Sequence, residues 1–114
     1  MHGTIDIEAT IARADSEFPA LFQLFGGYFH QDWHDEYATT AAAATTFRLE
    51  APPAAVGAAL AEIERVLAMR LDERTLGRLL HDGFGCSYVP QVDELSNEQW
   101  LRQLRAQLQP PAQA

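Results

Sequence analysis

Two histidines and three acids fall within one seven-residue stretch of this 114-residue chain, and side chains of these types could bind a metal ion. His30 and His34 lie four residues apart, so they would share one face of a helix. Asp32, Asp35 or Glu36 could then add an oxygen ligand. The familiar helical zinc signature is His-Glu-x-x-His, but the residues between these histidines read Gln-Asp-Trp. The sequence therefore predicts no metal site, and the alternative is a pair of surface histidines.

Carboxylates and the single thiol were also candidates for catalysis. The three acids just named have no visible nucleophile or cofactor motif around them. Glu62 and Glu64 are expected on the solvent face of a strongly predicted helix, as solvated charges. Cys86 is expected to be a small buried thiol rather than a nucleophile. Gly83-Phe84-Gly85 lacks the spacing of a phosphate-binding loop. We therefore predict no enzyme activity and no cofactor.

Binding explains the composition of this region better than catalysis does. The segment from Tyr28 to Tyr37 holds four aromatic residues together with the two histidines and three acids. Aromatic anchors supply contact area at protein interfaces, and acids steer association. Trp33 is either a lid over the core or an interface anchor, and the sequence does not choose between them.

The charge of the chain restricts the class of partner. Sixteen acids face eight basic residues, all of them arginines, which gives a formal net charge of −8. Phosphate backbones and anionic membranes would be repelled, so neither nucleic acid nor a membrane is an expected partner. A basic protein would be attracted and steered. The alternative is that excess acid only keeps a small domain soluble.

The cellular compartment follows from cysteine usage and the N-terminal sequence. One cysteine allows no intrachain disulfide. No basic segment followed by an apolar run opens the chain, and no apolar stretch approaches the roughly 20 residues that cross a bilayer. A cytoplasmic protein is expected.

Hydrophobic periodicity predicts an all-α fold, one compact domain of five to six helices with a core over about residues 5–108 and a disordered tail at 109–114. The predicted helices share apolar side chains at helical spacing. They run from Ile5 to about Ala14, through Phe18–Phe29, from Thr39 or Thr40 to Glu50, through Pro53–Met69, from Asp72 to Gly83, and from Ser96 to Leu108.

Several helix ends have recognisable capping residues. Asp15 or Ser16 is expected to cap the second helix, Asp72 the fifth and Ser96 the last, where Gln99 completes a capping box. The Gly26-Gly27 pair either ends its helix or lets another helix approach closely. Residues 84–95 are expected to form an ordered loop.

Ordered motifs in this chain resemble those of small bacterial immunity proteins that accompany contact-dependent growth inhibition toxins and related polymorphic toxins. The resemblance covers about residues 17–108. Its motifs are Phe18-Pro19-Ala20-Leu21, Tyr28-Phe29-His30-Gln31-Asp32-Trp33, Ala51-Pro52-Pro53 before a helix with Glu62-Ile63, Gly85-Cys86-Ser87-Tyr88, and Ser96-x-x-x-Trp100-Leu101-x-x-Leu104.

The resemblance implies a cytoplasmic antitoxin that binds a delivered toxin domain and blocks its active site or the access of its substrate. Such toxin domains are commonly nucleases, which need basic surfaces. An acidic inhibitor suits such a partner. The alternatives are an acidic helical adaptor or regulatory module and, from a different class, a small metal-dependent hydrolase using His30 and His34.

We divide the candidate residues into two groups. The partner-binding group is Trp33, His34, Asp35, Glu36 and Tyr37. The structural group is Tyr28, Phe29, His30, Gln31, Asp32 and Trp100. Tyr28, Phe29 and Trp100 are expected in the core, and Asp32 is expected to cap or hydrogen-bond a neighbouring backbone.

Overall fold

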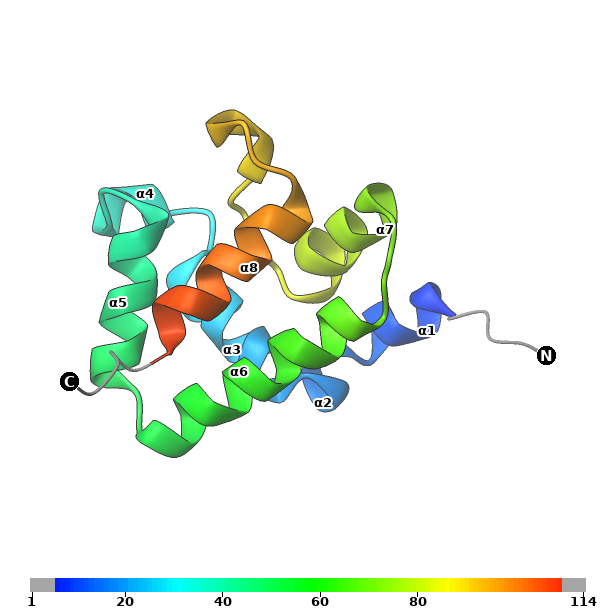
Figure 1. The fold of residues 1–114 in the computed structure, drawn as a ribbon, viewed down its shortest axis with the longest axis horizontal. Coiled ribbons are helices and arrows are strands. Elements are labelled where there is room, and N and C mark those ends of the chain that lie inside the picture. The colour runs from blue at the N-terminus through cyan, green and yellow to red at the C-terminus, as the bar shows by residue number, and fades with distance from the viewer. Residues whose placement is uncertain (1–5, 110–114) are drawn as a thin grey trace.

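The computed structural model describes residues 6–109, which form helices and loops without a strand (Figure 1). The all-α class is confirmed. The helices are α1 (Ile7–Ala12), α2 (Ala14–Glu17), α3 (Pro19–Tyr28), α4 (Trp33–Glu36), α5 (Thr40–Glu50), α6 (Pro53–Ala68), α7 (Glu73–Arg78), the π-helix η1 (Leu79–Gly83), the 3-10 helix η2 (Pro90–Asp93) and α8 (Asn97–Leu108). Short elements such as α2 and α4 account for the helices beyond the predicted five to six. Ile5 and tail residues 110–114 lie outside the described residues.

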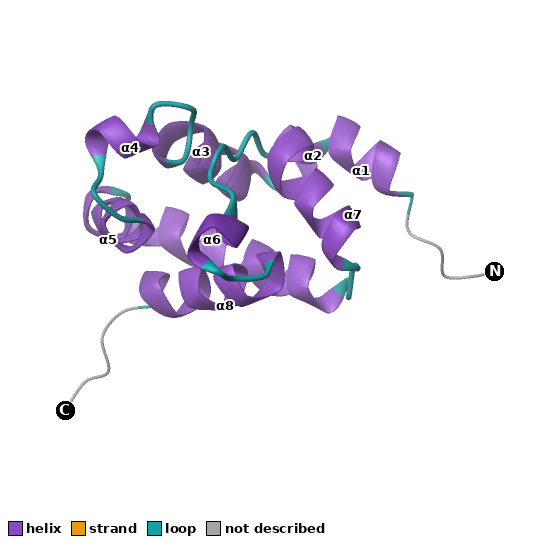
Figure 2. Cartoon of the chain, turned by 90° about the horizontal axis from the view of Figure 1, so that it is seen from above, coloured by secondary structure: helices purple, strands orange, loops and turns teal. Residues whose placement is uncertain are grey.

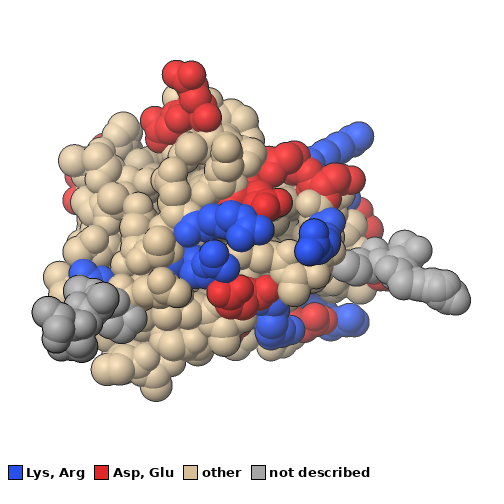
Figure 3. All heavy atoms as spheres, in the orientation of Figure 1, with Lys and Arg blue, Asp and Glu red and all other residues tan. Residues whose placement is uncertain are grey.

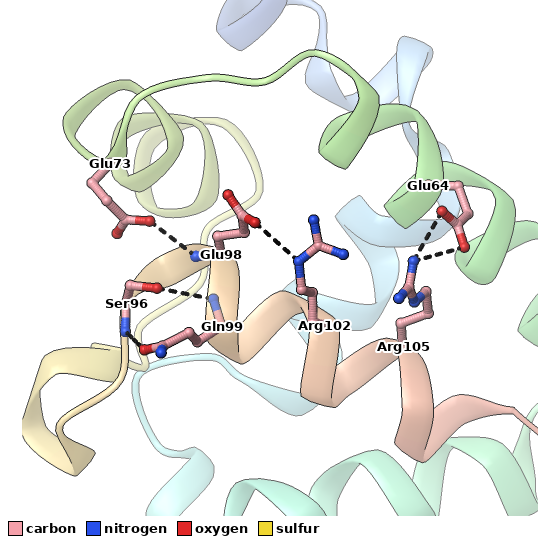
Figure 4. Close-up of polar contacts among 7 residues, drawn as sticks. All are labelled: Glu64, Glu73, Ser96, Glu98, Gln99, Arg102 and Arg105. Carbon is pink, nitrogen blue, oxygen red and sulfur yellow. Dashed lines mark hydrogen bonds and ion pairs between the residues drawn. The ribbon is translucent and has the colours of Figure 1, made fainter.

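Caps confirm three of the predicted helix starts. The side chain of Thr39 accepts the backbone N–H of Ala42 at 3.0 Å, and that of Asp72 accepts the N–H of Thr75 at 2.8 Å. Ser96 and Gln99 form the reciprocal capping box at the start of α8 (Figure 4). Local sequence sets these ends, because each cap bonds the N–H three residues ahead.

The start of α3 differs from the prediction. Neither Asp15 nor Ser16 caps this helix; both lie in α2, and the residue before Pro19 is the apolar Phe18. The glycine pair Gly26-Gly27 also behaves otherwise than expected. Both glycines lie within α3, which ends at Tyr28, and a Cβ on either would meet nothing within 4 Å. No neighbouring helix therefore packs closely against these two glycines.

Glu62 supplies the missing acceptor at the start of α3. Its carboxylate accepts the N–H of Leu21 at 2.9 Å and that of Ala20 at 3.2 Å, and Glu62 is only 8% exposed. The prediction that Glu62 faces solvent is wrong. The first N–H groups of a helix lack partners within the helix and carry partial positive charge, so a carboxylate from α6 is stabilised there. Glu64 is exposed, as predicted.

Aromatic rings fill the centre of the core. Phe29 and Trp100 are buried as predicted, with their ring centroids 5.2 Å apart. Tyr28 is only half-buried, because its hydroxyl reaches Glu50 at 2.9 Å near the surface. Phe22 belongs to the apolar stripe of α3 in the sequence, yet it is 42% exposed. The stripe is therefore wider than the face that α3 buries.

Helix α8 crosses the molecule and packs against α5, α6 and α7 (Figure 1). Helix α3 packs against α5 and α6. Seen from above, α1 to α4 follow one another along one side, with α1 and α4 at opposite ends (Figure 2). None of the helices formed by residues 6–109 is long and apolar enough to span a membrane.

Candidate functional site

The chain turns sharply between α3 and α4, and His30 closes the turn. Its Nδ1 accepts the backbone N–H of Asp32 at 3.0 Å, and its Nε2 lies 3.5 Å from a carboxylate oxygen of Glu36. A structural role for His30 fits these contacts. The expected cap from Asp32 is absent, because its side chain is exposed and makes no capping hydrogen bond to α4. The turn is held by the histidine ring and by a backbone hydrogen bond of 2.9 Å from the Trp33 N–H to the His30 carbonyl.

Trp33 and Tyr37, at the two ends of α4, are half-buried against the core. The ring centroid of Trp33 lies 6.1 Å from that of Phe29 and 5.6 Å from that of Tyr88. Tyr37 stacks on Tyr28, with a centroid distance of 6.0 Å. Trp33 therefore covers the core as a lid and still presents part of its ring to solvent, so both functions considered from the sequence remain open to it.

His34, Asp35 and Glu36 face solvent, as expected of partner-binding residues. Gln31, assigned from the sequence to the structural group, is exposed as well. The imidazole of His34 stacks on the indole of Trp33, with centroids 4.8 Å apart and planes inclined by 19°. An aromatic pair with two acids beside it is thus presented on the surface at α4.

Two tyrosines beside α4 donate hydrogen bonds to carboxylates. Tyr28 donates its hydroxyl to Glu50, and burial, together with this hydrogen bond, raises the pKa of Tyr28 to about 12. Tyr88 donates to Oδ2 of Asp93 at 2.6 Å, and burial followed by this contact raises the pKa of Tyr88 further still. Both phenols stay protonated at neutral pH and act as fixed hydrogen-bond donors.

The loop before α8 is ordered, as expected, and backbone contacts tie it to the core. The N–H of Ser87 donates to the carbonyl of Phe29 at 2.8 Å, and that of Cys86 donates to Leu80 at 2.9 Å. Gly85 has a φ of +73°, a left-handed conformation that favours glycine. His81 Nδ1 lies 2.7 Å from the carbonyl of Cys86. These contacts bring the segment after Cys86 alongside α4.

The two segments enclose a surface hollow of about 240 Å³. Its lining comes from α4, the start of α5 and the η2 loop, and consists of Trp33, His34, Ala38, Thr39, Thr40, Tyr88, Val92 and Asp93. Val92 is 72% exposed and Val89 is 42% exposed, which is unusual for valine. We call this surface, defined by residues 31–40 and 88–94, the α4–η2 face.

Sequence reasoning missed the η2 half of this face. From the sequence, Val89 to Glu94 are assigned only to the ordered loop of residues 84–95. A signal was present in the run Val-Pro-Gln-Val-Asp-Glu, which places two apolar residues and two acids in a loop expected to be exposed.

Charge is distributed unevenly over the molecule. The α4–η2 face carries five acids, and neither residues 14–47 nor residues 79–101 include an arginine. In Figure 3, acidic atoms project at the top, where Figure 1 places η2, while basic atoms gather across the middle of α8. Arg102 and Arg105 there pair with Glu98 and Glu64 at 2.9 and 3.0 Å (Figure 4). The unbalanced negative charge therefore concentrates at the α4–η2 face.

Two hollows of about twice the volume of the one beside α4 are lined by no residue of α4. One, of about 530 Å³, is lined by Arg70, Arg102 and Arg105 among others, and the ion pairs of Figure 4 flank it. The other, of about 460 Å³, lies between α7 and the start of α8. There Glu73 accepts the N–H groups of Asn97 and Glu98, which satisfies the N-terminus of α8. Ion pairs and helix capping thus engage Glu64, Glu73 and Glu98 in these hollows.

The remaining candidates for chemistry are accounted for by structure. Cys86 is 3% exposed, and burial raises the pKa of its thiol to about 12. Its Sγ lies 3.6 Å from the carbonyl of Tyr88. The prediction of a buried thiol is confirmed. Within residues 6–109, no three His, Cys, Asp or Glu side chains converge as a metal site would require.

Comparison with known proteins identifies the family. The family model described as CdiI immunity protein matches residues 17–108. The chain belongs to the CdiI immunity protein family. The match spans the same residues as the resemblance found in the sequence motifs. Membership does not test the Tyr28–Trp33 motif or the division of residues between fold and partner, which stay predictions.

A solved structure shares this family's fold. A chain of the "CdiA-CT/CdiI complex from Y. kristensenii 33638" superposes with a TM-score of 0.78 at 24% sequence identity. The superposition covers 82% of this chain and all of the other. At that identity the likeness establishes the fold. No curated protein matches the chain significantly.

Proposed function

We propose that this immunity protein binds the toxin domain of its own contact-dependent growth inhibition system and neutralises it by one-to-one occlusion, in the cytoplasm and without catalysis. The observation that carries the proposal, beside family membership, is the α4–η2 face, where half-buried rings lie among exposed acids. We assign the contact first to Trp33, His34, Asp35, Glu36 and Tyr37.

The composition of this face matches what a protein interface needs. Trp33 and Tyr37 are held by core contacts, so they lose little side-chain freedom when a partner covers them. Asp35 and Glu36 are exposed beside them. Rigid aromatic anchors with charges around them resemble the centre and rim of a binding site.

The charge indicates a basic partner. Like charges across an interface cost several kcal/mol, whereas opposite charges accelerate encounter. A nuclease fits, because its substrate-binding surface must attract phosphates. An acidic face covering that surface would compete with nucleic acid for the same basic groups.

Occlusion rather than catalysis is supported by the state of the chain's only thiol. Cys86 is buried, and its thiol stays protonated at neutral pH, so it cannot act as a nucleophile. His81, the histidine nearest to it in sequence, is engaged with the Cys86 carbonyl. An inhibitor that works by occlusion must be present in at least the amount of its toxin.

The test is to express the toxin domain encoded by the adjacent gene with and without this protein. We expect growth to be rescued and a 1:1 complex to be isolated, with toxin activity falling linearly to zero at one equivalent. Absence of a complex would contradict the proposal, and so would full neutralisation by a small fraction of one equivalent, which would indicate catalysis.

A further inference from the structure

We propose that the hollow between α4 and η2 accepts one cationic side chain, arginine or lysine, from the toxin domain. This inference rests on the proposed function and identifies the contact at its centre. The hollow joins the segment singled out in the sequence, through Trp33 and His34, to the η2 loop, through Tyr88, Val92 and Asp93.

The size of the hollow suits one side chain. Its volume of about 240 Å³ is below the range of about 300–1,000 Å³ found for drug-sized ligands. Its lining includes Trp33, which is half-buried, and Tyr88, which is only 3% exposed, and their rings meet edge to face at 86° with centroids 5.6 Å apart. The face of a tryptophan ring attracts guanidinium and ammonium groups most strongly, so Trp33 is the ring that a cation would meet.

Asp93 supplies the charge at this position. Its Oδ2 accepts the Tyr88 hydroxyl at 2.6 Å, which orients the carboxylate, and no donor among residues 6–109 reaches its Oδ1. An oriented carboxylate with a free oxygen is a ready acceptor for a charge-assisted hydrogen bond. No arginine in residues 79–101 competes for it.

Val92 supplies the apolar part of the site. It lines the hollow and is 72% exposed, so it can cover the aliphatic stem of a long cationic side chain. The η2 turn is held by hydrogen bonds from Val92 N–H to Val89 and from Leu95 N–H to Pro90, both 3.1 Å. The site is thus formed before binding, which lowers the entropic cost of association.

The first experiment compares two neighbouring acids by measuring affinity for the toxin domain from the adjacent gene. Asp93→Asn removes the charge in the hollow and keeps an oxygen for Tyr88. Glu94→Gln removes a neighbouring exposed charge that does not line the hollow. We expect Asp93→Asn to weaken binding at least about tenfold and Glu94→Gln by less than about threefold. Equal effects would overturn the proposal.

The second experiment places a cation inside or outside the hollow. Val92→Lys would occupy the hollow and repel the incoming charge, whereas Val89→Lys adds the same charge outside the lining. Both valines are exposed, so the melting temperature should stay close to the parent's. We expect only Val92→Lys to weaken binding strongly. If Val92→Lys weakens binding while Asp93→Asn does not, the occupant is apolar and the proposal fails.

The third experiment identifies the occupant. Each arginine and lysine of the toxin domain is replaced by alanine and combined with Asp93→Asn in a double-mutant cycle. One position should show coupling, with the second mutation costing little once the first is present. If no arginine or lysine of the toxin domain couples to Asp93, the hollow is not a cation site, and the proposed function still stands. Failure of the parent protein to bind the toxin at all overturns both.

Discussion

At the scale of single residues, Glu62 shows how one buried carboxylate joins two helices. It lies on α6 and bonds the first N–H groups of α3, about forty residues earlier in the chain. Phe18, at the N-cap position, has no side-chain acceptor to offer. This contact ties the start of α3 to α6.

Replacing Glu62 should cost stability without touching the α4–η2 face. Glu62→Ala leaves two N–H groups of α3 without their acceptor, and we expect the free energy of unfolding to fall by about 1–3 kcal/mol. Glu64→Ala is the matched control, because it breaks only an exposed pair with Arg105 and should cost about 1 kcal/mol or less. Chemical denaturation of both variants checks this, and equal losses would contradict it.

Cys86 should be unreactive in the native protein and should make stability fall at alkaline pH. Its pKa of about 12 in the fold lies above the ordinary value of 9.0, so the folded state holds the proton more tightly. That stabilisation is complete below about pH 9 and is lost as pH rises toward 12. Between pH 8 and pH 11 the free energy of unfolding should fall less for Cys86→Ala than for the parent, as chemical denaturation at each pH would show. At pH 7 the substitution should cost about 1 kcal/mol.

Thiol labelling provides an independent check on Cys86. A thiol reagent at pH 8 should modify the native protein slowly and the denatured protein at once. Fast labelling of the native state would show that the thiol is accessible, contrary to its 3% exposure.

At the scale of elements, the site is held by the end of α3. Phe29 packs on Trp100 and Trp33, and its carbonyl accepts the N–H of Ser87. One residue therefore supports both α4 and the loop leading to η2. The segment from Tyr28 to Tyr37 thus has a structural part, centred on Phe29 and His30, and an exposed part, His34 to Glu36.

Truncating Phe29 should damage the fold far more than truncating its exposed counterpart on α3. We expect Phe29→Ala to cost about 3–5 kcal/mol, as large-to-small core changes do. Phe22→Ala, at a site 42% exposed, should change stability by about 0.5 kcal/mol. Thermal melting distinguishes the two, and a mild effect at Phe29 would mean that the α4 turn is held by other contacts.

At the scale of the whole molecule, charge asymmetry should control how fast the toxin is captured. The α4–η2 face carries five acids and no arginine, and in Figure 2 α4 lies at the opposite end of the molecule from α1 and α2. A partner with a basic surface would be oriented before contact.

Charge reversal on α4 should slow association with the toxin domain. Asp35→Arg should lower the association rate and flatten its dependence on salt, and adding Glu36→Arg should extend the effect. Asp15→Arg is the matched control, because it makes the same charge change at an exposed site on α2. Stopped-flow kinetics at several salt concentrations decide this. If Asp15→Arg and Asp35→Arg lower the association rate equally, the net charge of the protein controls association and the position of the acids on α4 does not.

Three helix starts, the all-α class and most buried positions could be predicted from the sequence, because caps and apolar stripes depend on residues within a turn or two of each other. Thr39, Asp72 and Ser96 each bond the N–H three residues ahead, wherever the rest of the chain lies. Phe29 and Trp100 continue the apolar pattern of their helices, and both are buried in the core.

Contacts between distant segments could not be predicted in this way. Glu62 lies at the edge of the apolar stripe of α6, one turn from Ala59 and Val66, and only the packing of α3 turns it into a buried cap. The Asp93–Tyr88 pair and Trp33 belong to segments some fifty-five residues apart, which meet because the Ser87 N–H bonds Phe29. The amino-acid sequence by itself determined the helices and the acidic aromatic segment. Only the tertiary structure brought η2 beside α4 and formed the hollow, because long-range packing selects which exposed groups become neighbours.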